Sequence, residues 1–260
     1  MTSLTNPTIQ RFSFDQMLMI AEGLDPSRSV VHKFGANDDV GGTAEDVWTP
    51  GGVYPWPTAA ETVRVKAGGN AADTAAGNGA RSIIVEGLDE NLAPASATLV
   101  TAGASASDPS TVTFFRVFRA YPGAVGVYGA ANTGAIQIEN TTSTDVIAYI
   151  GAGLGQTEMA LYTIPADKKG YLLGIEATVD SAQSADLRMW QRENADDYTV
   201  PFSPKRLVTR FLALETAADR VVRAPIEFAP KTDIWLDATS GGASSLVAAS
   251  FDLVLVDQAA

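Results

Sequence analysis

The acidic residues whose types best fit a metal site lie between residues 34 and 54, in FGANDDVGGTAEDVWTPGGVY. Asn37, Asp38, Asp39, Glu45 and Asp46 offer the oxygen ligands that Ca²⁺ prefers. The alternating D-x-[DN]-x-[DN]-G frame of a calcium loop is absent, however, and its final Glu does not fall at the twelfth position. The sequence therefore predicts no metal or cofactor, and it leaves open adventitious Ca²⁺ binding at 37–46.

Residues for nucleophilic or acid–base catalysis are scarce. The chain has no cysteine and a single histidine, His32, which excludes thiolate chemistry and makes a Ser-His-Asp site depend on one residue that is usually structural. The other carboxylates considered are scattered, without a spacing that pairs an acid with a base: Asp145, Asp186, Asp196 and Asp197. The sequence predicts a protein that is not an enzyme.

Two glycine-rich segments suggest phosphate binding but do not meet its requirements. In GAGLGQ (151–156) the third glycine comes one residue too early for a dinucleotide fingerprint, and the residues that follow favour a strand rather than a helix. AGGNAADTAAGNGA (67–80) lacks the G-K-[ST] ending of a phosphate loop. We expect a flexible connector and a long surface loop or subunit contact, respectively.

Aromatic residues gather in WTPGGVYPWP (48–57), which is stiffened by three prolines. Trp48, Tyr54 and Trp56 suit a stacking platform for a carbohydrate. They suit equally an arm whose rings anchor in a neighbouring subunit, with support from Phe34. The residues alone leave both interpretations open.

Composition limits the class of protein. The 260 residues are 46% hydrophobic and 18% charged, with a net charge of −12 and a pI near 4.4. A folded globular chain is expected, and nucleic acid is an unfavourable partner because phosphate contacts need clustered cations. The N-terminus lacks the pattern of a signal peptide, and no apolar run has the length of a membrane span.

Hydrophobic alternation of period two dominates from about residue 60, whereas helical signal is confined to about 15–22. Strands are expected at 62–66, 82–86, 98–100, 111–119, 135–140, 145–150, 158–164, 170–179, 186–191, 207–215, 220–228, 234–237 and 246–256. Short strands separated by Gly, Asn, Asp and Pro predict an all-β protein with two antiparallel β-sandwich, jelly-roll-like domains. The expected parts are an attachment arm over 1–60, a first sandwich over 61–152 and a second over 153–260.

Several segments in order resemble a group of β-rich structural proteins of tailed bacteriophages, particularly marine podovirus-type phages. They are KFGANDDV, EDVWTPGGVY, AADTAAGNGARSIIVEGLDEN, FFRVFRA, NTGAIQI, GAGLGQTEMALYTIPADKKGYL and FAPKTDIWL. The resemblance runs from about Lys33 to Leu255 and departs at Asp167-Lys168-Lys169, where the group has Gly in the turn. It implies a non-enzymatic virion component and supplies no catalytic residues.

These observations predict a structural protein of a bacteriophage virion, either a capsid decoration or head fibre or a tail-associated protein. Its N-terminal arm would hold viral capsid or tail proteins through Phe34, Trp48, Tyr54 and Trp56. We expect a homo-oligomer, a trimer or a hexamer. The alternative function is a glycan-binding module that attaches the particle to its host, and a hydrolase ranks third.

Overall fold

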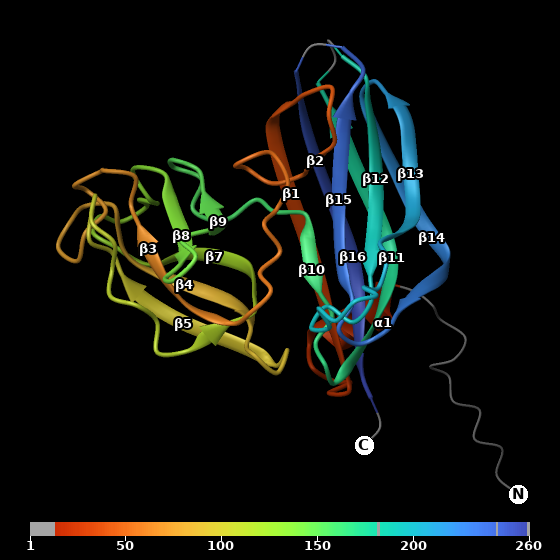
Figure 1. Ribbon diagram of the computed structural model, residues 1–260, viewed down its shortest axis with the longest axis horizontal. Coiled ribbons are helices and arrows are strands. Elements are labelled where there is room, and N and C mark those ends of the chain that lie inside the picture. Colours follow the sequence, from red (N-terminus) through yellow and green to blue (C-terminus); the bar gives the residue numbers. More distant parts are fainter. Residues whose placement is uncertain (1–13, 181–182, 243, 259–260) are drawn as a thin grey trace, which may run out of the picture.

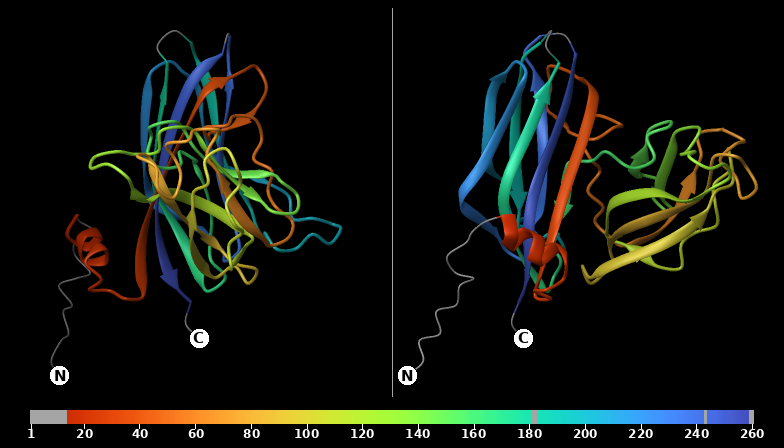
Figure 2. Two further views of the ribbon diagram at one scale, coloured as in Figure 1. Left: turned by 90° about the vertical axis from the view of Figure 1, so that its left-hand side faces the viewer. Right: turned by 180° about the vertical axis from the view of Figure 1, so that it is seen from behind.

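The computed structural model describes residues 14–180, 183–242 and 244–258, and nearly all of its regular structure is β-strand. A long sandwich of strands stands beside a smaller one, as the views in Figures 1 and 2 show. The expected all-β fold is confirmed. No helix in the described ranges is long and apolar enough to cross a membrane.

The long sandwich has the strand order of a jelly roll. Its strands are β1 (Arg28–Val40), β10 (Leu161–Thr163), β11 (Lys168–Val179), β12 (Ala185–Arg192), β13 (Arg206–Leu214), β14 (Ala217–Phe228), β15 (Asp233–Ser240) and β16 (Ser245–Asp257). In chain order the first strand pairs with the last, β1 with β16, and then β10 with β15, β11 with β14 and β12 with β13, all antiparallel. This is the pairing of one long hairpin wound into two sheets, β1-β16-β11-β14 and β10-β15-β12-β13.

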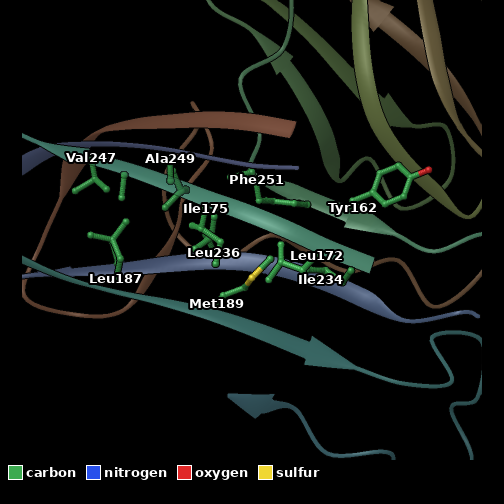
Figure 3. Packing of buried hydrophobic residues seen from close by; sticks show 14 of the residues in the cluster. Tyr162, Leu172, Ile175, Leu187, Met189, Ile234, Leu236, Val247, Ala249 and Phe251 are labelled. Carbon is green, nitrogen blue, oxygen red and sulfur yellow. The ribbon is translucent and has the colours of Figure 1, made fainter. Parts of the chain in front are cut away.

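Alternating apolar residues of the two sheets fill the space between them (Figure 3). From β11 and β16, Leu172, Ile175 and Phe251 face inward, and they meet Leu187 and Leu236 of β12 and β15. Each of these five side chains is at most 1% exposed. The period-two patterning therefore places a continuous apolar core within the sandwich, as the sequence predicts.

The smaller sandwich is inserted between β1 and β10. Its strands are β3 (Glu61–Lys66), β4 (Ala80–Leu88), β5 (Pro94–Val100), β6 (Thr113–Phe114), β7 (Arg116–Val125), β8 (Ile136–Asn140) and β9 (Val146–Ile150). They form the sheets β6-β3-β8-β9 and β5-β4-β7, and in the described residues they pair only with one another. A second apolar cluster lies between these two sheets and extends to Trp48, Leu161 and Trp235 at the jelly roll. The glycine-rich segment 151–155 leads from β9 back towards β10.

The structure differs from the predicted arm over residues 1–60. Residues 28–40 form β1, which completes the jelly roll by pairing along β16, and Glu45–Asp46 form the short strand β2 beside β15. The second sandwich thus takes a strand from the N-terminal part of the chain instead of consisting of 153–260 alone. Helix α1 (Phe14–Ala21) occupies the segment where helical signal was expected. The first 13 residues of the predicted arm lie outside the described residues.

Candidate functional site: the junction between the two sandwiches

The segment that the sequence marks for metal binding or attachment fastens the junction instead. After β2, Val47 donates its N–H to Leu236 of β15 at 2.9 Å and accepts one from Ala160 at 2.9 Å. Gly35 of β1 passes so close that a Cβ there would overlap the backbone of Val47 and Ala160. The segment therefore lies between strands of its own chain.

Of the carboxylates in this segment, Asp38 and Asp39 are exposed, whereas Glu45 is bonded within the protein. Glu45 accepts hydrogen bonds from the backbone N–H groups of Gly41 (3.1 Å) and Gly52 (2.9 Å) and from the amide of Asn37 (3.2 Å). Burial opposes ionisation of Glu45, but these donors hold its pKa below the usual value. Across the described residues, no group of three or more His, Cys, Asp and Glu side chains is placed to hold a metal ion.

Aromatic rings connect residues 44–57, which we call the crossing segment, to the sheet of β15. The ring of Trp48 meets Tyr54 with centroids 5.2 Å apart, Tyr54 meets Trp56 at 5.0 Å, and Trp56 meets Trp235 of β15 at 5.1 Å. Trp48 and Tyr54 are 4% and 1% exposed, and Trp56 is half-buried. Tilted and edge-on contacts of this kind are favourable beyond the area that they bury.

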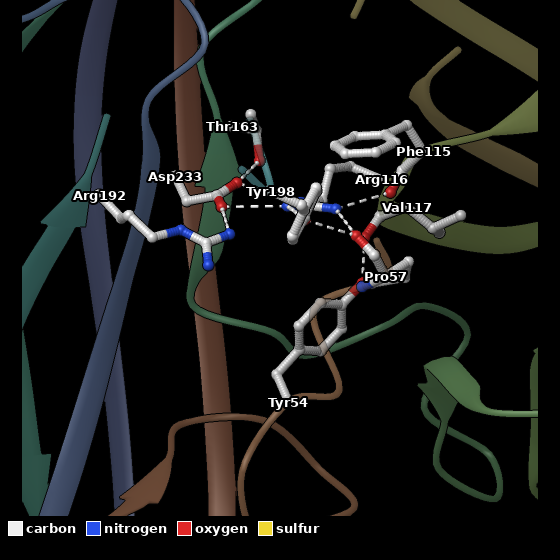
Figure 4. Close-up of polar contacts among 9 residues, drawn as sticks. All are labelled: Tyr54, Pro57, Phe115, Arg116, Val117, Thr163, Arg192, Tyr198 and Asp233. Carbon is white, nitrogen blue, oxygen red and sulfur yellow. Dashed lines mark hydrogen bonds and ion pairs between the residues drawn. The ribbon is translucent and has the colours of Figure 1, made fainter. Parts of the chain in front are cut away.

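A buried ion pair joins the inserted sandwich to the jelly roll (Figure 4). Arg116 of β7 holds Asp233 of β15 through two hydrogen bonds of 3.1 Å, and the two side chains are 1% and 0% exposed. Arg116 also donates to the carbonyl oxygen of Pro57 at 2.6 Å. Burial opposes its charge, but Asp233 keeps the pKa of Arg116 above its usual value. Arg192 adds a second cation, 2.7 Å from Asp233.

Beside this pair a cavity of about 460 Å³ opens between the sandwiches, with Lys33 and Phe34 of β1 in its lining. The ammonium of Lys33, which is 7% exposed, donates a hydrogen bond to the carbonyl oxygen of Phe118 in β7. Burial, helped by the neighbouring Arg119, lowers the pKa of Lys33 to about 7, while Glu86 opposes the shift. The lone His32 is exposed, and its Nδ1 lies 2.7 Å from Asp252 Oδ1 across the β1–β16 pair.

A second cavity, of about 350 Å³, opens where the crossing segment meets the outer face of β15. We call it the junction pocket, and its lining is Ala44, Asp46, Val53, Trp56, Arg192, Lys205, Trp235 and Asp237. Asp46 and Asp237 are paired residues of β2 and β15. Burial and the nearby charge of Asp237 raise the pKa of Asp46 to about 7, against the opposing effects of the Tyr54 N–H and Lys205.

The four residues predicted as arm anchors thus lie at an interface within the chain. Trp48 and Tyr54 are buried there, Phe34 borders the 460 Å³ cavity, and Trp56 borders the junction pocket. The sequence reasoning missed Arg116, Asp233 and the Asp46–Asp237 pair. Their spacing along the chain carries no signal, because antiparallel pairing of distant segments brings them together.

The glycine-rich segment 67–79 gathers with three other loops at the end of the inserted sandwich. We call residues 67–79, 101–107, 123–135 and 151–155 the loop cap. Asp73 fixes it from within by accepting hydrogen bonds from the N–H groups of Ala80 (2.8 Å), Thr133 (2.9 Å) and Gly134 (2.7 Å). Asn132 ties in the fourth loop by donating to the carbonyl oxygen of Gly151 at 2.7 Å.

Charged groups are few at the surface of this cap. The only charged residue within its ranges is Asp73, which is 0% exposed, and the guanidinium of Arg81 in β4 donates to the carbonyl oxygens of Gly77 (2.8 Å) and Ala76 (3.5 Å). Outward-facing residues include Tyr128, Val127 and Leu154, and Tyr128 is as exposed as in an open chain, at 104%. The view from the side of the inserted sandwich shows these loops (Figure 2, left).

Comparison with known proteins gives distant structural similarities only. No family model and no curated sequence matches the chain. T=1 particles derived from infectious bursal virus share 10% identity and a TM-score of 0.25, over 89% of this chain and 70% of that one. Empty particles of cowpea mosaic virus share 9% identity and a TM-score of 0.20, over 74% of this chain and 80% of that one. An isomalto-dextranase of Arthrobacter globiformis T6, complexed with panose, shares 14% identity and a TM-score of 0.23 over 86% of this chain. The match spans only 36% of that enzyme's length. The jelly-roll assignment rests on the strand pairing and not on these similarities.

Proposed function

We propose that this chain is a non-enzymatic structural component of a bacteriophage virion that packs against further copies of itself through the loop cap. The observation that carries the proposal is this exposed and internally braced surface, whose residues include no exposed carboxylate although the chain is strongly acidic. The jelly-roll fold is compatible with the role, since it recurs in viral capsid proteins as well as in lectins and cupins.

Electrostatics favours the loop cap as the contact between copies. Each copy carries a net charge of −12, so two copies repel each other when carboxylates come face to face. Where the same patch of every copy meets at the symmetry axis of an oligomer, a patch without exposed carboxylates avoids that repulsion. The cores of protein interfaces are depleted of charged residues and enriched in Tyr, which matches the exposed Tyr128.

Rigidity supports the same role. Asp73 and Asn132 bond to loops that are distant in sequence, so the cap is ordered before any partner arrives. A surface that is already ordered loses little conformational entropy on association.

Attachment to the capsid or tail is proposed for the segment 14–27, because residues 28–57 belong to the jelly roll. Leu18, Met19 and Leu24 in or beside α1 are 47%, 37% and 63% exposed. Phe34, Trp48, Tyr54 and Trp56 would then serve attachment indirectly, by holding the two sandwiches together. A trimer suits a capsid decoration or head fibre, and a hexamer suits a tail ring.

Cross-linking tests the contact between copies, because the chain contains no cysteine. Tyr128→Cys places one thiol on the exposed 123–135 loop of the cap, and Val221→Cys places one on β14, where Val221 is 72% exposed. With a bismaleimide reagent, Tyr128→Cys should give cross-linked dimers and Val221→Cys should remain monomeric. Equal cross-linking of the two variants, or none in either, would contradict the assigned surface.

Occupancy of particles tests the role itself. Purified virions should contain the protein in many copies, and Tyr128→Asp should reduce its occupancy whereas Val221→Asp should not. If the protein is absent from purified particles, the proposed function is wrong, whatever the cross-linking shows.

A second candidate function, attachment to a host glycan, is favoured by one observation. The junction pocket opens to solvent beside two tryptophans, although Trp48 and Tyr54 are buried.

A further inference from the structure

The junction pocket has the size and lining of a binding site for a small molecule. Its volume of about 350 Å³ falls within the range of about 300–1,000 Å³ for ligand pockets. Exposed residues such as Ala44 and Val53 form its rim, and Val53 is 70% exposed. A ligand can therefore enter without a rearrangement of the fold.

The apolar part of the wall is formed by two indole rings. Trp56 and Trp235 lie with their centroids 5.1 Å apart at an angle of 60°. Trp235 is fixed on β15 opposite Trp190 of β12, and Trp56 is held between two prolines. Rigid indoles are suited to contact the C–H groups of a sugar ring.

One polar group is buried but only partly satisfied by the protein. Asp46 is 5% exposed, and the single hydrogen bond that it accepts in the described structure comes from the N–H of Tyr54, at 2.7 Å to Oδ2. Asp237 differs, because it accepts from Arg188 Nε at 2.7 Å and from Trp190 Nε1 at 2.8 Å. Asp46 Oδ1 therefore has the capacity to bond a ligand in the pocket.

The charges of the lining cancel when Asp46 is ionised. Two carboxylates, Asp46 and Asp237, face two cations, Arg192 and Lys205. Arg192 is paired with Asp233, and the ammonium of Lys205 lies 4.5 Å from the ring centroid of Trp190. Protonation of Asp46 leaves one positive charge. A lining with donors, acceptors and so little net charge suits a molecule with many hydroxyl groups.

We propose that the junction pocket binds a neutral saccharide, with one pyranose ring against Trp56 and Trp235 and a hydroxyl group bonded to Asp46. Because the pKa of Asp46 is near 7, its carboxyl can accept or donate that hydrogen bond around neutral pH. Saccharide binding is a property of the isolated chain. It can be absent while the proposed role in a particle stands, and it can be present while that role is wrong.

Intrinsic fluorescence gives a direct test, because two of the four tryptophans line the pocket. The purified chain is titrated with D-glucose, D-galactose, D-mannose and N-acetyl-D-glucosamine to about 100 mM, which saturates even a site with a millimolar Kd. At least one neutral sugar should change the emission saturably. D-glucuronate and D-glucosamine, the charged analogues, should bind about tenfold more weakly or not at all.

Three variants locate the binding. Val53→Trp fills the mouth of the pocket from an exposed position, so it should abolish binding while thermal unfolding stays unchanged. Trp56→Ala should weaken binding by about tenfold or more, measured by isothermal titration calorimetry. Trp48→Phe, which removes a tryptophan outside the lining, is the matched control and should retain binding.

Three outcomes overturn the proposal. They are no saturable change with any neutral sugar, unchanged binding in Val53→Trp, and preferential binding of a charged analogue.

Discussion

We expect the substitution Arg116→Met to weaken the contact between the two sandwiches and so to lower the stability of the protein. The guanidinium makes a bidentate contact with Asp233 and donates to the carbonyl oxygens of Pro57 and Phe115 at 2.6 and 2.9 Å. Met keeps much of the side-chain volume but removes every one of these donors. The variant therefore isolates the polar function of a side chain that is 1% exposed.

The magnitude follows from burial. Removing one partner of a buried ion pair costs about 3–5 kcal/mol, because the other charge stays in a low-dielectric environment. Here Asp233 keeps Arg192 and the hydroxyl of Thr163, each at 2.7 Å. That residual bonding lowers the cost, and the Pro57 carbonyl oxygen keeps the hydroxyl of Tyr198 at 2.9 Å. Loss of the donor to the Phe115 carbonyl oxygen raises the cost by about 1 kcal/mol or more. We expect a loss of about 3–5 kcal/mol in the free energy of unfolding.

Asp233→Asn should be more damaging than Arg116→Met. It leaves the guanidinium groups of Arg116 and Arg192 close together with no carboxylate between them, so two like charges remain at a buried site. This order of severity distinguishes an electrostatic role from simple packing, since Asn is nearly isosteric with Asp.

The matched control is Arg64→Met. Arg64 pairs with Glu139 at 2.7 Å within the inserted sandwich, but these side chains are 30% and 12% exposed. Partial exposure reduces such a pair to about 1 kcal/mol or less.

Urea unfolding at pH 7, followed by tryptophan fluorescence and circular dichroism, measures all four proteins. Arg116→Met should lower the midpoint strongly, and its fluorescence transition should precede loss of the strands because the tryptophans report on the junction. A cost for Arg116→Met below about 1 kcal/mol, like that of Arg64→Met, would refute the reasoning. So would a milder effect of Asp233→Asn.

Three further predictions concern the same region. Since burial raises the pKa of Asp46 to about 7, the native state binds more protons than the unfolded state between about pH 4 and 7. Because of Asp46, the free energy of unfolding should therefore fall by about 1.4 kcal/mol for each unit by which the pH rises across that window. Urea titrations of Asp46→Asn should lack this slope. Lys33, with its pKa lowered to about 7, has the opposite sign: the unfolded state binds more protons between about pH 7 and 10, so stability rises with pH there. Lys33→Met should remove that rise, and the same slope in wild type and variant would contradict it. Gly35→Ala forces a Cβ into the backbone of Val47 and Ala160, so we expect a loss of about 2 kcal/mol or more in thermal unfolding, whereas Gly52→Ala meets no neighbouring atom and should cost less despite its positive φ.

The strands were predictable wherever burial follows the local pattern. The expected strand over 170–179 corresponds to β11 (Lys168–Val179), and that over 246–256 corresponds to β16 (Ser245–Asp257). In β16 every second residue from Ser245 to Leu255 is buried, and in β11 the alternation runs to Leu172 and resumes at Ile175 after an irregularity in the pairing. Over these stretches, alternation in the sequence reports the structure directly.

Strand β1 shows where this approach fails. The buried residues in its second half include Lys33, Gly35 and Asn37, which carry no apolar alternation. They are buried because the crossing segment and the inserted sandwich pack against the strand and satisfy its polar groups. A segment with polar and glycine residues then resembles an arm that needs a partner, although its partner is the remainder of the same chain.

By itself, the sequence determined the all-β class, most strand positions and the absence of thiol chemistry, because these depend on residue type and short-range periodicity. Only the tertiary structure decided that β1 closes a jelly roll around an inserted sandwich. It also decided that Arg116 meets Asp233 and that Asp46 lies beside Asp237 and two tryptophans. These contacts join segments far apart in the chain, and such pairings are set by the winding of the whole sheet rather than by any local pattern.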